Sequence, residues 1–102
     1  MRPEPVFTPG AHDDVFAAAA YYAAHDPRLG LAFLDEVERA ASLIYEAPLL
    51  STMVEPPVRR QLLRRFPYGV FFTAGSATDP DVILAVVDLR QDPDVVRRAY
   101  LR

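Results

Sequence analysis

The sequence predicts a single α+β domain over residues 1–102, in which an antiparallel helical hairpin packs on one face of a small, mainly antiparallel sheet. Helical periodicity is confined to the first half of the chain, whereas the second half consists of β-branched and aromatic runs separated by turn sequences. With 51% hydrophobic residues, a chain of this length can bury one core. The expected order is one N-terminal strand, two helices, three strands and a short C-terminal helix.

The first half contains the strand and helices that precede the sheet. Glu4 to Thr8 is a short β-leaning run, and Thr8-Pro9 then provides an N-cap and a first-turn proline, so we expect a helix to begin there. This helix should end near His25-Asp26-Pro27, and a second helix should run from about Pro27 to Glu46. The short connection makes the two helices an antiparallel hairpin. The apolar stripe of the second helix consists of Phe33, Leu34, Val37, Ala40, Ala41 and Ile44.

Three strands are expected in the second half. The candidates are Val58 to Phe66, Gly69 to Ala74 and Asp81 to Leu89. Polar and apolar residues come in doublets in the first of them, which favours a bulged strand. The run from Val82 to Val87 is continuously apolar, as in a strand covered on both faces, so we place it in the middle of the sheet.

The remaining segments are a loop and a terminal helix. Leu49 to Pro57 is expected to be a loop, because Pro56-Pro57 discourages strand pairing. Asp92-Pro93-Asp94 has the composition of a helix start, and it predicts a short helix over Val95 to Leu101.

Composition excludes several classes of protein. The chain has no cysteine, which removes disulfide scaffolds, thiolate nucleophiles and cysteine-based zinc sites. It has no apolar run long enough to span a membrane and no N-terminal signal pattern, so we expect a soluble, cytoplasmic protein without a membrane partner. The net charge of −3 is unevenly distributed, because residues 1–55 sum to −6 and residues 56–102 sum to +3. All eleven basic residues are arginine.

The motifs of common enzymes are missing. The four glycines are scattered rather than gathered in a phosphate-binding loop, and none of the three serines lies in a G-x-S-x-G turn. His12 and His25 are thirteen residues apart on or beside one predicted helix, which separates them by about 20 Å and prevents a shared metal site. We therefore expect no metal and no cofactor.

Arginines beyond Pro57 are the main candidates for binding a target. If the predicted strands are neighbours, these side chains line one rim of the sheet, where they would bind phosphates or carboxylates and steer association. A solvated edge strand whose charges block unwanted pairing explains the same spacing, and the residues alone leave both interpretations open. Tyr68 and Tyr100 are candidates for base stacking or proton transfer, or else for core packing. The arginine set is Arg59, Arg60, Arg64, Arg65, Arg90, Arg97 and Arg98.

These residues carry a resemblance to a known family. In the first half the matching positions are Val6-Phe7-Thr8, Ala11, Asp13-Asp14, Tyr21-Tyr22, Gly30, Phe33, Val37 and Pro48. In the second half they are Arg59-Arg60, Arg65-Phe66-Pro67-Tyr68, Val70-Phe71-Phe72, Ile83 to Val87, Arg90 and Asp92-Pro93. In order and spacing the chain resembles RelE/ParE-type toxins of type II toxin–antitoxin modules, and in particular the ParE-like, plasmid-stabilisation branch.

The resemblance implies a growth-inhibiting toxin that a cognate antitoxin neutralises in a hetero-oligomer. The antitoxin would combine a DNA-binding N-terminus with an acidic, amphipathic tail that folds on the toxin. Exposed apolar positions along the hairpin would accept an amphipathic helix, and a sheet edge would accept an added strand. The implied antitoxin-binding positions are Val15, Ala19, Tyr22, Phe33 and Val37.

Three functions follow from the resemblance. The first is a non-catalytic ParE-like toxin that binds DNA gyrase. The second is a RelE-like endoribonuclease that cleaves ribosome-bound mRNA. The third is a non-toxic scaffold that keeps only antitoxin binding. For the nuclease the matching catalytic candidates are Arg60, Arg65, Arg90 and Tyr100.

Two departures from the family pattern weigh against RNA cleavage. The chain has no lysine, and arginine is a poor general base because it stays protonated. Asp88 stands where many ParE-like members carry histidine. A carboxylate there would serve as a base but would also repel the substrate phosphate.

Overall fold

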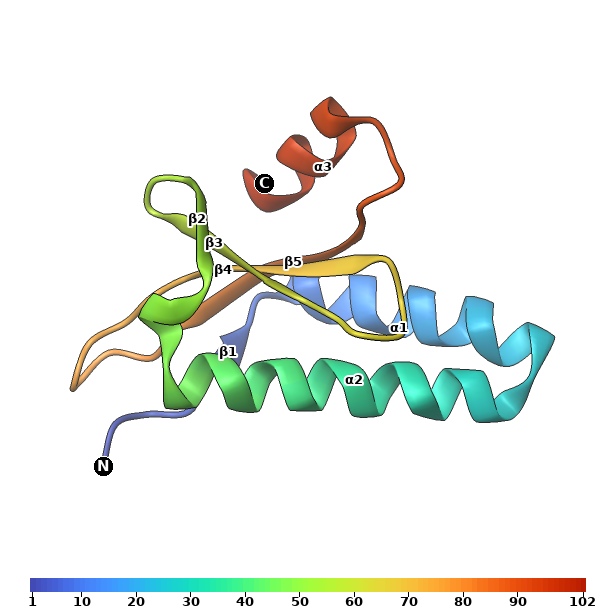
Figure 1. The fold of residues 1–102 in the computed structure, drawn as a ribbon, viewed down its shortest axis with the longest axis horizontal. Helices are drawn as coiled ribbons and strands as arrows, with labels where there is room; N and C mark the ends of the chain where they lie inside the picture. The colour runs from blue at the N-terminus through green and yellow to red at the C-terminus, as the bar shows by residue number, and fades with distance from the viewer.

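The computed structural model describes all 102 residues and places a five-stranded sheet between two helical layers of unequal size (Figure 1). Two long helices lie side by side under one face of the sheet, and a short C-terminal helix lies over the other face. The α+β class and the helical hairpin on a mainly antiparallel sheet are confirmed. The elements are β1 (Val6–Phe7), α1 (Pro9–His25), α2 (Pro27–Glu46), a 3-10 turn η1 (Pro48–Leu50), β2 (Thr52–Glu55), β3 (Val58–Leu62), β4 (Tyr68–Thr73), β5 (Val82–Asp88) and α3 (Pro93–Tyr100).

The strand order is β1-β5-β4-β3-β2, with β1 parallel to β5 and every other pair antiparallel. The middle strand is therefore β4, and the prediction that placed the 82–87 run there is wrong by one position. The N-terminal strand pairs with the outer side of β5 through Val6 and Val82, and this makes β5 the second strand from one edge.

The segment predicted as a loop contains a strand. β2 pairs with β3 in antiparallel register, with Met53 opposite Arg59. Pro56 and Pro57 occupy the turn between the two strands, where neither has to donate a ladder hydrogen bond. The prolines therefore mark the turn of a hairpin instead of preventing one.

The predicted first strand of the sheet is shorter than expected. β3 ends at Leu62, so the second arginine doublet, Arg64 and Arg65, lies in the turn that follows. The bulge expected in this strand occurs elsewhere. β5 carries an extra residue at Leu84, which lies between the pairs Phe71–Ala85 and Phe72–Ile83.

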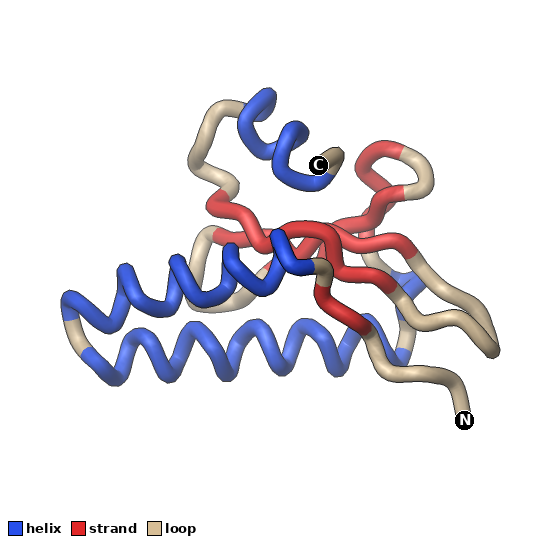
Figure 2. The backbone as a smooth tube through the Cα atoms, turned by 180° about the vertical axis from the view of Figure 1, so that it is seen from behind, coloured by secondary structure: helices blue, strands red, loops and turns tan.

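The β5 bulge divides the strand between two cores. Ile83 and Val86 face the helical hairpin, whereas Ala85 and Val87 face α3. The hairpin-side core is the larger one, and Phe33 is fully buried in it. On the other side Tyr100 of α3 stacks on Phe71 of β4, with ring centroids 4.8 Å apart. Figure 2 shows the two helical layers from behind, with the sheet between them.

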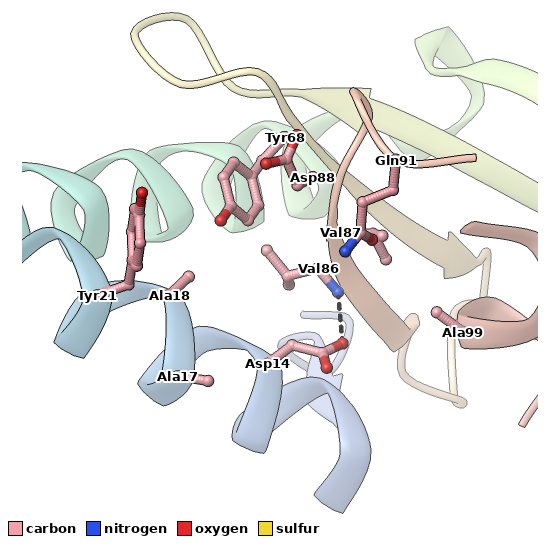
Figure 3. Close-up of a pocket in the computed structure, with 10 residues that line it drawn as sticks. All are labelled: Asp14, Ala17, Ala18, Tyr21, Tyr68, Val86, Val87, Asp88, Gln91 and Ala99. Carbon is pink, nitrogen blue, oxygen red and sulfur yellow. Dashed lines mark hydrogen bonds between the residues drawn. The ribbon is translucent and has the colours of Figure 1, made fainter. Parts of the chain in front are cut away.

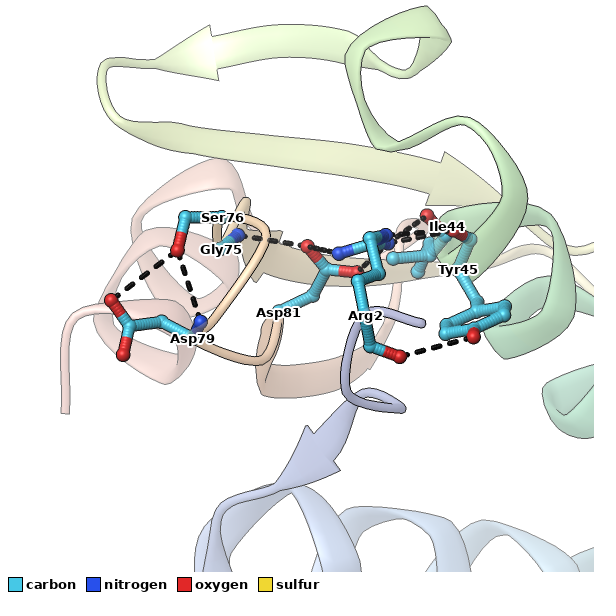
Figure 4. A network of polar contacts seen from close by, with 7 residues as sticks. All are labelled: Arg2, Ile44, Tyr45, Gly75, Ser76, Asp79 and Asp81. Carbon is cyan, nitrogen blue, oxygen red and sulfur yellow. Dashed lines mark hydrogen bonds and ion pairs between the residues drawn. The ribbon is translucent and has the colours of Figure 1, made fainter.

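A buried ion pair connects the chain's N-terminus to the start of β5. Asp81 is completely buried, and Arg2 donates to it through Nη2 at 2.6 Å and Nη1 at 3.2 Å. The same guanidinium donates to the Tyr45 carbonyl at the end of α2, and the Tyr45 hydroxyl donates back to the Arg2 carbonyl. The Gly75 N–H completes the partners of Asp81 at 2.8 Å. Figure 4 shows that three separate segments meet at this network.

Close approach of α1 and α2 depends on Gly30. A Cβ atom at this position would lie 2.8 Å from the Ala23 Cβ and 3.0 Å from the Ala19 carbonyl oxygen. Such distances force the helices apart, and overpacking of this kind costs about 1–3 kcal/mol.

We predict that Gly30→Val lowers the free energy of unfolding by about 2 kcal/mol, because the branched side chain collides with α1. Urea denaturation followed by circular dichroism measures this. Ala20→Val, at an exposed position of α1, is the matched control and should cost about 0.5 kcal/mol from helix propensity alone. Equal losses in the two variants would show that Gly30 does not set the helix spacing.

Candidate functional site

The predicted target-binding arginines lie in three places instead of along one rim. Arg64 and Arg65 follow β3, and Arg90 follows β5. Both strands end at the same end of the sheet, because Leu62 pairs with Gly69 and Tyr68 pairs with Asp88. Arg97 and Arg98 belong to α3, above the outer face, and Arg59 and Arg60 lie within β3.

The turn with the second arginine doublet is held against the hairpin. The Glu36 carboxylate on α2 accepts the Arg64 backbone N–H at 2.6 Å and an Arg39 side-chain hydrogen bond at 3.3 Å. These contacts hold the pKa of Glu36 below its usual range, the Arg39 hydrogen bonds contributing most. The side chains of Arg64 and Arg65 are exposed and form no ion pair. The backbone of this turn is thus fixed while its two guanidinium groups face solvent.

Arg59 and Arg60 point to opposite faces of β3, as neighbours on a strand must. Arg59 donates to the carbonyl oxygens of Leu49 and Ser51 at 3.3 and 3.0 Å. It therefore holds the η1–β2 connection onto β3. Arg60 lies on the α3 side, where its Nε is buried and has no hydrogen-bond partner.

Arg60 lines a groove of about 260 Å³ between the outer sheet face and α3. Its aliphatic stem lies over Gly69, where an added Cβ would be 3.1 Å from the Arg60 Cγ. The bare backbone of Gly69 thus gives this side chain room to lie flat. The other lining residues are Val54, Phe71, Leu89, Gln91, Pro93, Val96 and Tyr100.

A polar clamp fixes α3 over this groove. Glu55 at the end of β2 accepts two hydrogen bonds from Arg97, at 2.7 and 2.9 Å, and one from the Tyr100 hydroxyl at 2.7 Å. The Arg97 hydrogen bonds, followed by that of Tyr100, lower the pKa of Glu55 to about 2. Burial and the bond to Glu55 raise the pKa of Tyr100. Tyr100 is therefore a structural residue in this arrangement, a role that the sequence left open.

A second cavity, of about 300 Å³, lies between α1 and the end of β5 (Figure 3). Asp14 and Asp88 both line it, and Asp14 accepts the Val86 N–H at 3.0 Å. Asp88 is paired with Arg90 at 2.7 Å, and the hydrogen bonds from Arg90 hold the pKa of Asp88 below its ordinary value. Burial, followed by the Tyr22 and Asp88 charges, raises the pKa of Tyr68 to about 12.

The four nuclease candidates do not share one centre. Arg60 and Tyr100 line the same groove, whereas Arg65 and Arg90 lie at the end of the sheet. A general base works best with a pKa near the working pH. The pKa shifts of Glu55, Asp88 and Tyr68 all lead away from neutrality. The arrangement is suited to binding anions at Arg64 and Arg65 more than to moving a proton.

A separate apolar groove of about 360 Å³ lies between α1 and α2 and is also lined by Phe7 of β1. Val15 and Val37 line it, as the implied antitoxin positions require. Phe33, Ala19 and Val37 all belong to the hairpin-side core, so of the implied positions only Val15 and Tyr22 are partly exposed. The assignment of these positions to an antitoxin stays a prediction. Tyr22 packs against that core through Phe33 and Phe66. The implied antitoxin positions do not include the groove residues Phe7, His12, Phe16, Leu34, Glu38 and Ala41, although Leu34 and Ala41 belong to the predicted apolar stripe of the second helix.

Ion pairing distributes charge unevenly over the surface. Six of the eleven arginines form ion pairs, and the five that do not are Arg59, Arg60, Arg64, Arg65 and Arg98, all in the second half. No sequence signal pointed to the partners Asp81, Glu55 and Asp14, because each pair joins residues more than forty positions apart.

No helix combines the length and apolar character of a membrane span, and no group of three or more potential ligands is placed to hold a metal ion.

Comparison by sequence gives no match to a family model or to a curated protein. Comparison of structures gives a clear match to a chain of the chromosomal ParDE TA system from P. aeruginosa. The TM-score is 0.70 at 18% sequence identity, and the match covers 83% of this chain and 94% of that chain. The chain has a ParE-like fold. At this identity the match establishes the architecture alone.

The Glu55 clamp predicts a pH dependence of stability. A carboxyl with a depressed pKa in the folded state stabilises the fold above its ordinary pKa of 4.5, and this contribution is lost as the pH falls through about 2. Melting temperatures of the native protein and Glu55→Gln should therefore differ at pH 6 and converge as the pH falls towards 2. Glu46→Gln, which removes a carboxylate outside any ion pair, is the control. A constant difference between the native protein and Glu55→Gln would contradict the clamp.

Proposed function

We propose that this chain is the toxin of a two-gene toxin–antitoxin module and that it inhibits growth by binding a cellular target. The observation that carries the proposal is the structural likeness to a chain of the P. aeruginosa ParDE TA system over most of both chains. The resemblance of the sequence to the ParE-like branch supports DNA gyrase as the target. A cognate antitoxin neutralises the toxin by docking on it.

The target-binding surface is the end of the sheet that carries Arg64 and Arg65. Their guanidinium groups are exposed and outside any ion pair, and the Glu36 contact fixes the backbone that presents them. Planar guanidinium groups bind carboxylates and phosphates through paired hydrogen bonds. The neighbouring hydrophobic Leu62 is half exposed, so the surface combines charge with an apolar anchor.

Binding without catalysis is the better supported mode of action. Hydrogen bonds from arginine lower the pKa of Glu55 and of Asp88, whereas burial raises the pKa of Tyr68. Because both oxygens of the Asp88 carboxylate accept hydrogen bonds from Arg90, Asp88 is not a free base for the 2′-hydroxyl of an RNA. The antitoxin, in turn, binds at the apolar groove between α1 and α2.

We predict that the isolated protein inhibits supercoiling by purified gyrase and that the double variant Arg64→Ala/Arg65→Ala raises the half-inhibitory concentration about tenfold. Loss of one hydrogen bond to a charged group, worth about 1.5 kcal/mol or more, accounts for that factor. Arg28→Ala, which removes an exposed arginine at the connection between α1 and α2, is the control and should inhibit like the native protein.

Other results would select another function. Growth arrest with intact supercoiling and cleaved mRNA would replace gyrase binding with the RelE-like endoribonuclease, and Arg60→Ala or Arg90→Ala should then abolish cleavage. Unhindered growth during strong expression without antitoxin would leave only the antitoxin-binding scaffold.

A further inference from the structure

The groove between α1 and α2 has a charge character that specifies its partner. Its floor is apolar, and Leu34, Val37 and Ala41 supply it from one face of α2 at helical spacing. These residues span about 10 Å along the helix axis, or two turns. The α1 side contributes Phe16, which is 56% exposed, beside Val15. An amphipathic helix laid between two helices fits such a floor.

Free carboxylates surround this groove. Glu38 lines it directly, and Glu38 and Ala41 also line an adjoining cavity of about 250 Å³ that contains Glu4. Asp35 lies three residues before Glu38 on α2, and Asp13 lies three residues before Phe16 on α1, so each shares a face with a groove residue. None of these four carboxylates forms an ion pair.

No free cation balances these carboxylates in the first half of the chain. Arg2, Arg28 and Arg39 are its only arginines, and all three are engaged by Asp81, Asp26 and Glu36. No arginine lines the groove, and His12 is its only basic side chain. Arg102, from the C-terminus, acts on the charge of Asp13. The negative charge of Glu4, Asp35 and Glu38 is therefore left for a partner to neutralise.

We propose that the hairpin groove binds a basic amphipathic helix, one with an apolar stripe flanked by lysine or arginine. This inference rests on the proposed function, because it specifies the antitoxin segment that docks there. It changes the expectation of an acidic amphipathic tail for this segment. An acidic helix would bring like charges together over Glu4 and Glu38, and such pairs work against association.

Two labelled synthetic helices test the proposal. Both have about 16 residues and leucine at the same i, i+3 and i+4 positions, and the flanking positions are all lysine in one and all glutamate in the other. Fluorescence anisotropy measures their binding to the whole protein. The lysine helix should bind at least about tenfold more tightly than the glutamate helix at low salt, and the difference should shrink at about 0.5 M salt.

Variants of the protein distinguish binding at the groove from non-specific electrostatic binding to an acidic protein. Glu38→Lys should weaken the lysine helix about fivefold and strengthen the glutamate helix. Asp94→Lys makes the same change of net charge on the exposed surface of α3 and should leave both affinities unchanged. Phe16→Ser and Leu34→Ser, both at exposed positions that tolerate substitution, should weaken both helices at least fivefold.

The outcomes decide between the inference and the proposed function. Equal affinities for the two helices, or equal effects of Glu38→Lys and Asp94→Lys, would overturn the charge preference. Absence of binding, or binding that Phe16→Ser and Leu34→Ser leave unchanged, would overturn the groove as a docking site. A protein that discriminates between the helices as expected but neither arrests growth nor inhibits gyrase would overturn the toxin assignment and leave the groove preference standing.

Discussion

Both faces of the sheet are apolar, and the helical layers that pack on them differ greatly in size. The hairpin of α1 and α2 covers one face, whereas the eight-residue α3 covers only part of the other. A helix this short gains little stability from its own hydrogen bonds and depends on packing and anchoring. Tyr100 stacked on Phe71 supplies the packing, and the hydrogen bonds that Arg97 and Tyr100 donate to Glu55 supply the anchor. The partly covered face leaves the groove in which Arg60 lies.

Much of the architecture follows from local patterns. Caps at Thr8 and Asp26 and the helical stripe of α2 are short-range signals, and α1 and α2 begin where these signals indicate. The sequence did not predict that β2 pairs with β3, because Pro56-Pro57 is compatible with both a hairpin turn and a loop. β5 is not the edge strand because the two-residue strand β1 pairs with its outer side, and the paired residues are more than seventy positions apart. Such non-local pairing produces no periodic pattern in the sequence.

The candidate site was less predictable than the fold, because a charged residue's role depends on its partners. Arg97 and Arg64 look alike in sequence. In the structure Arg97 is bound by Glu55, whereas Arg64 is held only through its backbone and presents a free side chain. Likewise Phe33 shares its helical stripe with Leu34, but only Leu34 reaches the groove. The apolar stripe of α2 is wider than its contact with the sheet, so the sequence does not indicate which of its residues are exposed.

Ion pairing within the chain leaves an acidic surface on the helical hairpin and a basic surface on the sheet half. Each internal ion pair removes one charge of each sign from the surface, so the groups left over define what a partner meets. Around the hairpin groove these are Glu4, Asp13, Asp35 and Glu38, with Glu46 at the end of α2. In the sheet half, five unpaired arginines outnumber the unpaired Asp79, Asp92 and Asp94. A single partner that covers both surfaces therefore needs basic residues in one segment and acidic residues in another. A partner with the opposite order meets like charges at both places, which gives the protein selectivity beyond the shape of its grooves.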